Sequence, residues 1–157
     1  MAGDLILPLE RFRRLLRPPA RLLGLDVGRR RIGLAISDPA WRVATALDTV
    51  HRSRLKADLE AIGRIVAEWE VKGFVCGLPV GDDGRLTRRA QAVRQFARDL
   101  VVAVPLPLCF IDETLTSAET EEELIRTADL SRARRARVVD KLAAQRILEA
   151  ALARLAG

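Results

Sequence analysis

Acidic residues close two apolar runs of this sequence, where a charge is costly to bury. Asp26 ends the run that begins at Leu22, and Asp112-Glu113 ends a later run. Asp140 stands near the start of a helical pattern toward the C-terminus. A carboxylate at the end of a buried strand needs a cation or hydrogen-bond donors to offset its lost hydration. These positions together are therefore a candidate metal centre.

Carboxylate oxygens suit Mg²⁺ and Mn²⁺, and a cluster of them can hold two ions roughly 3.5 to 4 Å apart for in-line hydrolysis of a phosphodiester bond. One ion would activate water, and the other would steady the leaving oxygen. Each carboxylate also has a simpler interpretation: a turn aspartate at Asp26, and a partner for the helix dipole at Asp140. Only the set as a whole favours a metal-dependent nuclease.

Arginine supplies almost all of the positive charge. The 157 residues include 27 Lys and Arg, of which only three are lysines, and the net charge is +6. Guanidinium groups make bidentate contacts with phosphate, and beside an acidic centre they can hold a polyanion that the carboxylates would otherwise repel. Two groups are candidates for this role: Arg29, Arg30 and Arg31 in a turn, and Arg132, Arg134, Arg135 and Arg137 in a linker.

Other residue types argue against other chemistry. His51 is the only histidine, so neither a Ser-His-Asp relay nor a multi-histidine metal site is expected. Cys76 and Cys109 lie alone inside apolar runs, which favours reduced core residues over a zinc site or a disulfide. No apolar run approaches the roughly 18 residues needed to cross a bilayer, and the first residues are too acidic for a signal peptide. We expect a cytoplasmic protein with no membrane partner.

The length and the 49% hydrophobic content predict a single domain with a continuous core. Residues 1–20 are interpreted as an N-terminal extension, and residues 21–157 as the domain. Within the extension, four apolar residues have the spacing of a short basic amphipathic helix that ends before Pro18-Pro19. They are Leu9, Phe12, Leu15 and Leu16.

Three strands are expected next, at residues 21–26, 32–38 and about 42–50, joined by short turns as an antiparallel meander. In the second strand large residues alternate with small ones such as Gly33 and Ala35. This alternation predicts that another element packs closely on the small-residue face.

Helical spacing of apolar residues from Leu55 to Trp69 then predicts a helix with an N-cap at Ser53 that ends before Gly73. A second helix is expected over 86–100 and a last over 139–150. Buried strands are expected at 74–78 and 108–111, and a capping box at 116–119 predicts a short helix. The later strands would join the sheet through right-handed crossovers. The predicted fold is a mixed five-stranded α/β sheet with helices on both faces.

Four spaced motifs carry a resemblance to a known family. They are Leu25-Asp26-Val27-Gly28 with residues 32–38, Gly77-Leu78-Pro79 with Gly84, residues 112–116, and residues 139–149. In this order, over about residues 21–155, they resemble the YqgF family, also called RuvX, of pre-16S ribosomal RNA nucleases and Holliday junction resolvase-like proteins. The resemblance implies a ribonuclease H-like fold and a divalent-metal nuclease that matures the 5′ end of 16S ribosomal RNA.

The resemblance also implies site residues. The acidic positions of the family fall on Asp26, Glu113 and Asp140, with Mg²⁺ or Mn²⁺ as the expected cofactor. Asp112 is a candidate for an assisting role, and Asp38 is a weaker candidate. The chain departs from the family pattern at Thr114, where arginine is common, and in the loop at 80–83, where asparagine is common. These departures bear on substrate contacts more than on the fold.

Three other interpretations remain open on the sequence. The same carboxylates could serve a Holliday junction resolvase acting on branched DNA, which predicts a symmetric dimer. The arginines alone could serve a non-catalytic RNA-binding ribosome-assembly factor, although the three acidic positions argue against it. An actin-like or sugar-kinase ATPase shares the core fold but needs two such domains. We expect pre-16S ribosomal RNA in ribosomal precursor particles as the partner, and a monomer or weak homodimer.

Overall fold

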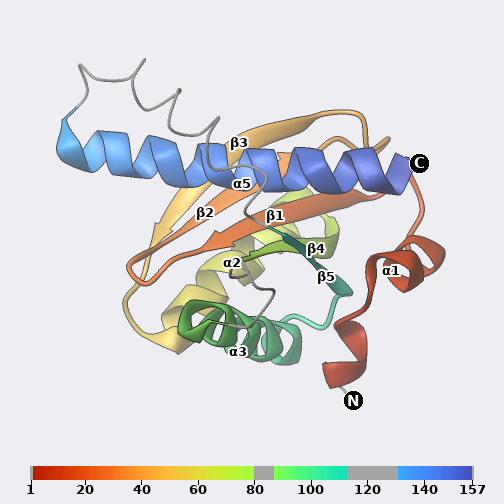
Figure 1. Cartoon of the computed structure of the whole chain (residues 1–157), viewed down its shortest axis with the longest axis horizontal. Helices are drawn as coiled ribbons and strands as arrows, with labels where there is room; N and C mark the ends of the chain where they lie inside the picture. Colours follow the sequence, from red (N-terminus) through yellow and green to blue (C-terminus); the bar gives the residue numbers. More distant parts are fainter. Residues whose placement is uncertain (1, 80–86, 113–130, 157) are drawn as a thin grey trace.

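The computed structural model describes residues 2–79, 87–112 and 131–156, which form a mixed sheet with helices on both faces (Figure 1). The strand order is β3-β2-β1-β4-β5. The strands are β1 (Arg21–Val27), β2 (Arg31–Ser37), β3 (Ala44–His51), β4 (Val71–Leu78) and β5 (Leu108–Asp112). The first three pair antiparallel, whereas β4 runs parallel to β1 and β5 parallel to β4. The predicted five-stranded mixed sheet is confirmed.

Helices α2 (Leu55–Trp69) and α3 (Arg88–Ala103) cover one face of the sheet, and α5 (Arg132–Ala156) covers the other (Figure 1). Alternation along β1 divides its residues between the two layers. Leu23 and Leu25 belong to the core of the α2 and α3 layer, whereas Leu22 belongs to the core of the α5 layer. Among the described helices, none combines the length and the apolar character needed to span a membrane.

Helix α5 lies very close to the sheet because glycines face it. A Cβ built at Gly24 would lie 2.9 Å from Leu148 Cβ and 3.1 Å from the Ala144 carbonyl oxygen. A Cβ built at Gly33 would overlap the backbone carbonyl of Asp140. The close packing expected on the small-residue face of the second strand is thus confirmed, and it sets the height of α5 above β1 and β2.

The residues before β1 pack onto this domain as η1 (Ala2–Leu5) and α1 (Leu9–Leu15). The N–H of Leu7 donates to the Leu108 carbonyl at 2.8 Å, beside a parallel bridge between Ile6 and Leu108. Phe12 of α1 is fully buried in the core of the α5 layer. The predicted amphipathic helix is confirmed, and the segment before it covers the edge of β5.

Two details of the sequence interpretation are wrong. The linker predicted at 132–137 is instead the start of α5, because the stretch holds no Gly or Pro and both Arg and Ala favour a helix. Ser53 does not cap α2, which begins after Arg54. The Ser53 N–H instead donates to Asp58 Oδ1 at 3.0 Å. The short helix predicted at 116–119 lies outside the described residues.

Candidate metal and nucleic-acid site

Asp26 and Asp140 approach each other where α5 crosses the sheet. Asp26 of β1 is the direct cross-strand partner of Gly33, and the carbonyl of Asp140 fills the space above Gly33. Residues directly opposite each other in antiparallel strands share a face, so the Asp26 side chain lies on the α5 side, beside Asp140. Asp26 is only 9% exposed, and the Asp140 side chain is 19% exposed. Two of the three predicted carboxylates thus come to one place.

The third predicted carboxylate, Glu113, lies outside the described residues. Its neighbour Asp112 ends β5, where alternation from Ile111 of the α5 layer directs the Asp112 side chain to the opposite face from Asp26. Strand β4 separates β5 from β1, so the two strand ends are about 10 Å apart at ordinary strand spacing. Within the described ranges, no three His, Cys, Asp or Glu side chains form a group that could hold a metal ion.

Arginines contact both carboxylates. Arg31 Nε donates to Asp140 Oδ2 at 2.5 Å, and Arg89 Nη2 lies 3.8 Å from Asp26 Oδ1. Arg89 belongs to the first turn of α3, where the Thr87 hydroxyl caps the helix by accepting the Ala90 N–H at 3.1 Å. The sequence did not single out Arg89, because only the crossover between β4 and α3 brings it to the end of β1. A cation at the carboxylates would compete with these two guanidinium groups.

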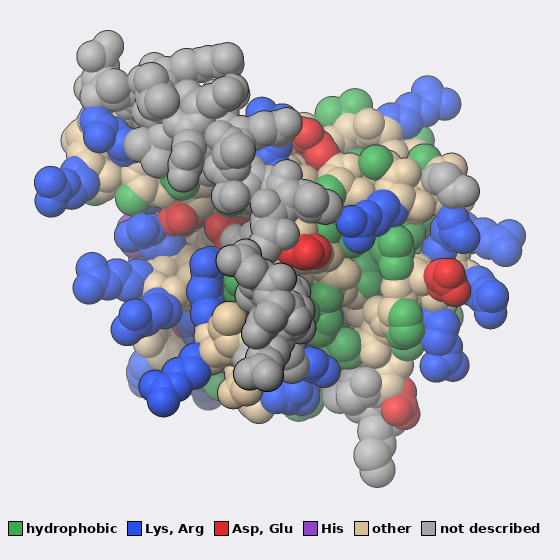
Figure 2. Space-filling model, in the orientation of Figure 1, with side chains coloured by type: hydrophobic (Ala, Val, Ile, Leu, Met, Phe, Trp, Pro, Cys, Tyr) green, Lys and Arg blue, Asp and Glu red, His purple; other side chains and the backbone are tan. Residues whose placement is uncertain are grey.

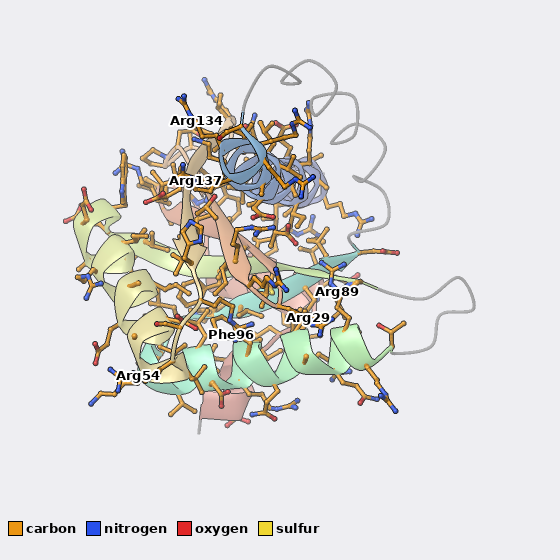
Figure 3. All side chains as sticks on the ribbon, turned by 90° about the vertical axis from the view of Figure 1, so that its left-hand side faces the viewer. Arg29, Arg54, Arg89, Phe96, Arg134 and Arg137 are labelled. Carbon is orange, nitrogen blue, oxygen red and sulfur yellow. The ribbon has the colours of Figure 1, made fainter. Side chains whose placement is uncertain are left out.

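Two basic clefts flank the carboxylates. One, of about 570 Å³, is lined by residues 28–31 and by Asp140. The other, of about 510 Å³, is lined by residues of the β1–β2 turn and of α3, including Arg29, Arg88 and Arg89. Figure 3 shows Arg29 and Arg89 together between the sheet and α3. Because Arg29 lines both clefts, they adjoin at the β1–β2 turn and present positive charge beside the acidic pair.

The second predicted group of arginines lies on the first turns of α5. Arg137 precedes Asp140 by three residues, and its carbonyl accepts the Thr49 hydroxyl of β3 at 2.8 Å. Arg132 precedes Asp140 by eight residues, which is about 12 Å along the helix. Figure 3 shows Arg134 and Arg137 on the α5 side of the sheet, away from Arg29 and Arg89. Arg137 therefore lies about one helical turn from Asp140, on the β3 side, whereas Arg132 and Arg134 are farther along α5 and Arg135 is half-buried.

Arg52 anchors the turn that carries Arg29 to Arg31. Its Nη1 donates to the Gly28 carbonyl at 2.8 Å, and its Nε lies 3.4 Å from Asp58 Oδ2. Its guanidinium also lies 5.1 Å from the centre of the Phe96 ring on α3. Asp58 is only 3% exposed, so the turn is tied to both helices of that layer. No sequence motif marked Arg52, because its partners come from three separate elements.

Asp38, a weaker acidic candidate, follows the end of β2 that is distant from Gly33. Its Oδ1 accepts the N–H groups of Arg42 at 2.7 Å and Val43 at 2.9 Å. The Val43 N–H holds the pKa of Asp38 below its ordinary value. Five residues of extended chain separate Asp38 from Gly33, which is about 17 Å. Asp38 therefore closes a turn and lies outside the acidic pair.

Sequence comparison identifies relatives of this chain. Residues 20–154 match the model of the RuvX family, described as Holliday junction resolvase. A protein of Beijerinckia indica is 44% identical over 151 residues, which cover 96% of this chain and 91% of the relative. A protein of Bradyrhizobium sp. (strain BTAi1) is 49% identical over 135 residues, which cover 86% of this chain and 83% of the relative. Both carry the name "Putative pre-16S rRNA nuclease".

Solved structures of resolvases share the fold. RuvC of T. thermophilus, in complex with a Holliday junction substrate, superposes with a TM-score of 0.57 at 16% identity, over 87% of this chain and 96% of RuvC. The yeast mitochondrial Holliday junction resolvase Ydc2 gives a TM-score of 0.55 at 10% identity, over 94% of this chain and 85% of Ydc2. These likenesses confirm the ribonuclease H-like fold expected from the sequence.

Proposed function

Because this chain belongs to the RuvX family of nucleases, we propose that it cuts phosphodiester bonds of pre-16S ribosomal RNA, with a divalent cation bound by Asp26, Glu113 and Asp140. The observation that carries the proposal is that Asp26 and Asp140 lie on the same face of the sheet, next to Gly33, with two arginine-lined clefts nearby. The substrate in this proposal is taken from the names of the relatives. Action on ribosomal precursor particles would place the chain in the cytoplasm.

The chemistry of the donor set fits Mg²⁺ or Mn²⁺. Asp26 and Asp140 offer only carboxylate oxygens, the ligand type that these hard cations prefer. A bound cation would activate water and stabilise the leaving oxygen. Asp26 and Asp140 would hold it from one side, on β1 and α5. Glu113 would have to reach across β4 to join them.

The arginines would hold the substrate. Arg31 and Arg89 neutralise Asp140 and Asp26 in the free protein. A guanidinium group can exchange a carboxylate for a phosphate oxygen, since it binds both with the same donor geometry. Arg29 and Arg30 are exposed beside Arg31, and they would extend the contact along the nucleic-acid strand. Phosphate contacts fix the position of a strand without reading its sequence, so we infer that the ribosomal precursor particle presents the bond to be cut.

A cleavage assay tests this proposal. Purified protein would receive RNA that spans the 5′ end of the 16S precursor, or a four-way DNA junction, with Mg²⁺, with Mn²⁺ or with EDTA. We expect metal-dependent cleavage of the RNA. Asp26→Asn and Asp140→Asn should abolish it without unfolding the protein, because a neutral amide binds a hard cation poorly. The control is Asp99→Asn, which makes the same change in a carboxylate of α3 that accepts a hydrogen bond from Gln95. This variant should cleave the RNA as the unmodified protein does.

Two other outcomes would replace the proposal. Symmetric cuts in the junction, with no cleavage of RNA under the same conditions, would make the chain a junction resolvase. That candidate is favoured by the description of the family and by the likeness to RuvC. RNA binding without cleavage in either metal would instead indicate a non-catalytic assembly factor.

A further inference from the structure

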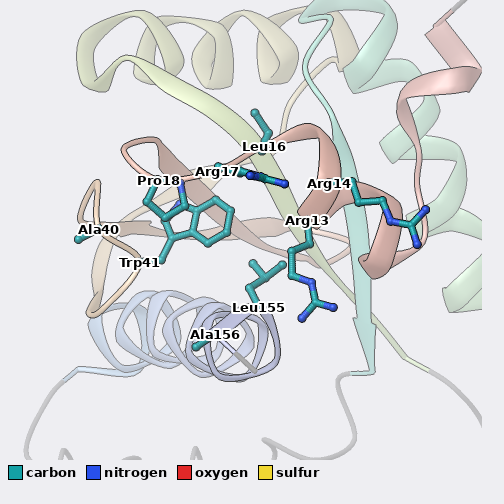
Figure 4. Close-up of a pocket in the computed structure, with 9 residues that line it drawn as sticks. All are labelled: Arg13, Arg14, Leu16, Arg17, Pro18, Ala40, Trp41, Leu155 and Ala156. Atoms are coloured by element: carbon teal, nitrogen blue, oxygen red, sulfur yellow. The ribbon is translucent and has the colours of Figure 1, made fainter.

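A second basic surface lies where α1 meets the C-terminal end of α5. A pocket of about 390 Å³ is found there (Figure 4). Arg13, Arg14 and Arg17 contribute its basic side chains, and Trp41 and Leu155 are among its apolar ones. We call it the α1–α5 pocket. Its volume lies within the range of small-molecule sites, about 300 to 1,000 Å³.

The apolar side of the α1–α5 pocket is held in place by the fold. Trp41 is 8% exposed, and its indole N–H donates to the Ala20 carbonyl at 2.6 Å. Its backbone has a positive φ of 62°, in the turn that Asp38 closes. Leu155 packs in the core of the α5 layer. Figure 4 shows the Trp41 ring beside Arg17, with Leu155 and Arg13 on the adjoining wall.

Within the described residues, no acidic side chain forms an ion pair with the arginines of the α1–α5 pocket, although Arg14 also lines a neighbouring pocket with Asp4. Arg13, Arg14 and Arg17 are exposed, and in the described part of the chain none of them forms an ion pair. No acidic residue is among those that line the pocket. The C-terminal end of α5 contributes roughly half a negative charge, which three guanidinium groups outweigh. Figure 2 shows Lys and Arg side chains at the right-hand edge, near α1, as well as along the left-hand edge.

The α1–α5 pocket and the acidic pair are joined by one rigid element. Leu155 follows Asp140 by fifteen residues on α5, which is about 22 Å along the helix axis. A nucleic-acid strand stacked at about 3.4 Å per nucleotide covers this distance with about seven nucleotides. A nucleic-acid strand that is cut at Asp26 and Asp140 therefore reaches the α1–α5 pocket with a segment of about seven nucleotides.

We propose that the α1–α5 pocket binds the same nucleic-acid strand a second time, about seven nucleotides from the bond to be cut. Arg13, Arg14 and Arg17 bind its backbone phosphates, and Trp41 and Leu155, which are 8% and 6% exposed, form the apolar wall of the pocket. The identity of the strand rests on the proposed function. The three arginines precede residue 20, where the match to the family begins, so the phosphate contacts come from the N-terminal segment, whereas Trp41 lies within the matched residues.

The test compares the binding of a long and a short RNA in EDTA, where no cleavage occurs. The variant is Arg13→Gln/Arg14→Gln/Arg17→Gln, and the matched control removes the same charge from exposed residues of α2 and α3 as Lys56→Gln/Arg64→Gln/Arg98→Gln. Each phosphate contact to a single strand contributes about 0.7 to the slope of log affinity against log salt. At 0.1 M salt this contribution corresponds to about fivefold in affinity. We expect the variant to bind a 30-nucleotide RNA at least about tenfold more weakly, with a slope lower by about 2. Its affinity for a five-nucleotide RNA should not change.

Several results would overturn the proposal. They are equal losses for both RNA lengths, an equal loss in the control variant, or unchanged binding of the long RNA. Weakened binding to precursor particles with unchanged binding to naked RNA would make the pocket a protein contact instead. If the length-dependent loss is found but the protein cuts no RNA in Mg²⁺ or Mn²⁺, the proposed function fails while the binding surface stands. Thermal unfolding of both triple variants checks that each is folded.

Discussion

Replacement of Gly33 by alanine should separate the two carboxylates. The added Cβ would overlap the backbone carbonyl of Asp140, and a helix backbone cannot rotate out of the way as the end of a side chain can. Carbon and oxygen atoms in contact are ordinarily about 3.3 Å apart or more. Restoring that separation requires α5 to retreat from β2 by about 1 Å or more. Asp140 moves with α5, whereas Asp26 stays on β1.

The expected losses follow from that displacement. An overpacked contact typically costs about 1 to 3 kcal/mol, and a clash with backbone belongs at the upper end. A shift of about 1 Å in a reacting group can lower a rate by about a hundredfold. We therefore expect Gly33→Ala to lose about 3 kcal/mol of unfolding free energy and about a hundredfold in cleavage rate. The rate loss should persist at temperatures where the variant is fully folded.

Urea denaturation and single-turnover cleavage measure these two quantities. Gly63→Ala is the matched control, because a Cβ at Gly63 inside α2 would meet only Val104 Cγ2 at 3.7 Å. Gly63→Ala should raise the free energy of unfolding by about 0.5 to 1 kcal/mol, because alanine is more favourable than glycine within a helix. If Gly33→Ala cleaved and unfolded like the unmodified protein, the close approach of α5 to β2 would be refuted, and with it the placement of Asp140 beside Asp26.

Three further predictions concern the cap of α3, a turn and a cysteine. Thr87→Ala should lower the free energy of unfolding, measured with urea, by about 1 kcal/mol and should weaken RNA binding, because the lost cap frays the turn that carries Arg89. Thr87→Ser keeps the hydroxyl and should restore both the stability and the binding. The Val43 N–H lowers the pKa of Asp38 below its ordinary 3.8, so the carboxylate stabilises the fold above that pH and the contribution is lost as the pH falls through the lowered pKa. The difference in thermal stability between the unmodified protein and Asp38→Ala should therefore hold at neutral pH and shrink below about pH 4, and a constant difference would contradict the assignment. Burial raises the pKa of Cys109 to about 12, so a disulfide reagent at pH 8 should label Cys109 only after unfolding, and rapid labelling of the folded protein would argue against its burial.

Much of the fold was predictable because its signals are local. Short turns between alternating strands predicted the meander. The small residues around Gly33 predicted that some element packs closely there, and the structure shows that this element is α5. The charged end of an apolar run pointed to Asp26 for the same reason, whereas Asp140 was named for its place in the last helical pattern and for the family resemblance. The boundary at Arg132 was wrong because a run of arginines was interpreted as a linker, although Arg and Ala favour a helix.

Most of the contacts that sequence reasoning missed join residues far apart in the chain. Arg89 reaches Asp26 only because α3 starts beside the end of β1, and nothing local marks that crossover. Arg52 meets Gly28, Asp58 and Phe96 from three elements. Asp58 also accepts the Ser53 N–H, so a side chain inside α2 takes over the turn at which a Ser53 cap was predicted. The tertiary fold determines which of the many chemically similar arginines make these contacts.

Leu7 and Leu108 are about 100 residues apart in the chain, yet a backbone hydrogen bond joins them. A ribosome adds roughly 5 to 20 residues per second, so the N-terminal segment waits about 5 to 20 s for the strand that it covers. Until β5 is made, Phe12 has no complete core to enter. Contacts between distant parts of a chain also form late, because the entropy of closing the loop between them is lost first. Docking of α1 is therefore a late folding step, and Arg13 and Arg17 meet Leu155 only after nearly the whole chain has been synthesised.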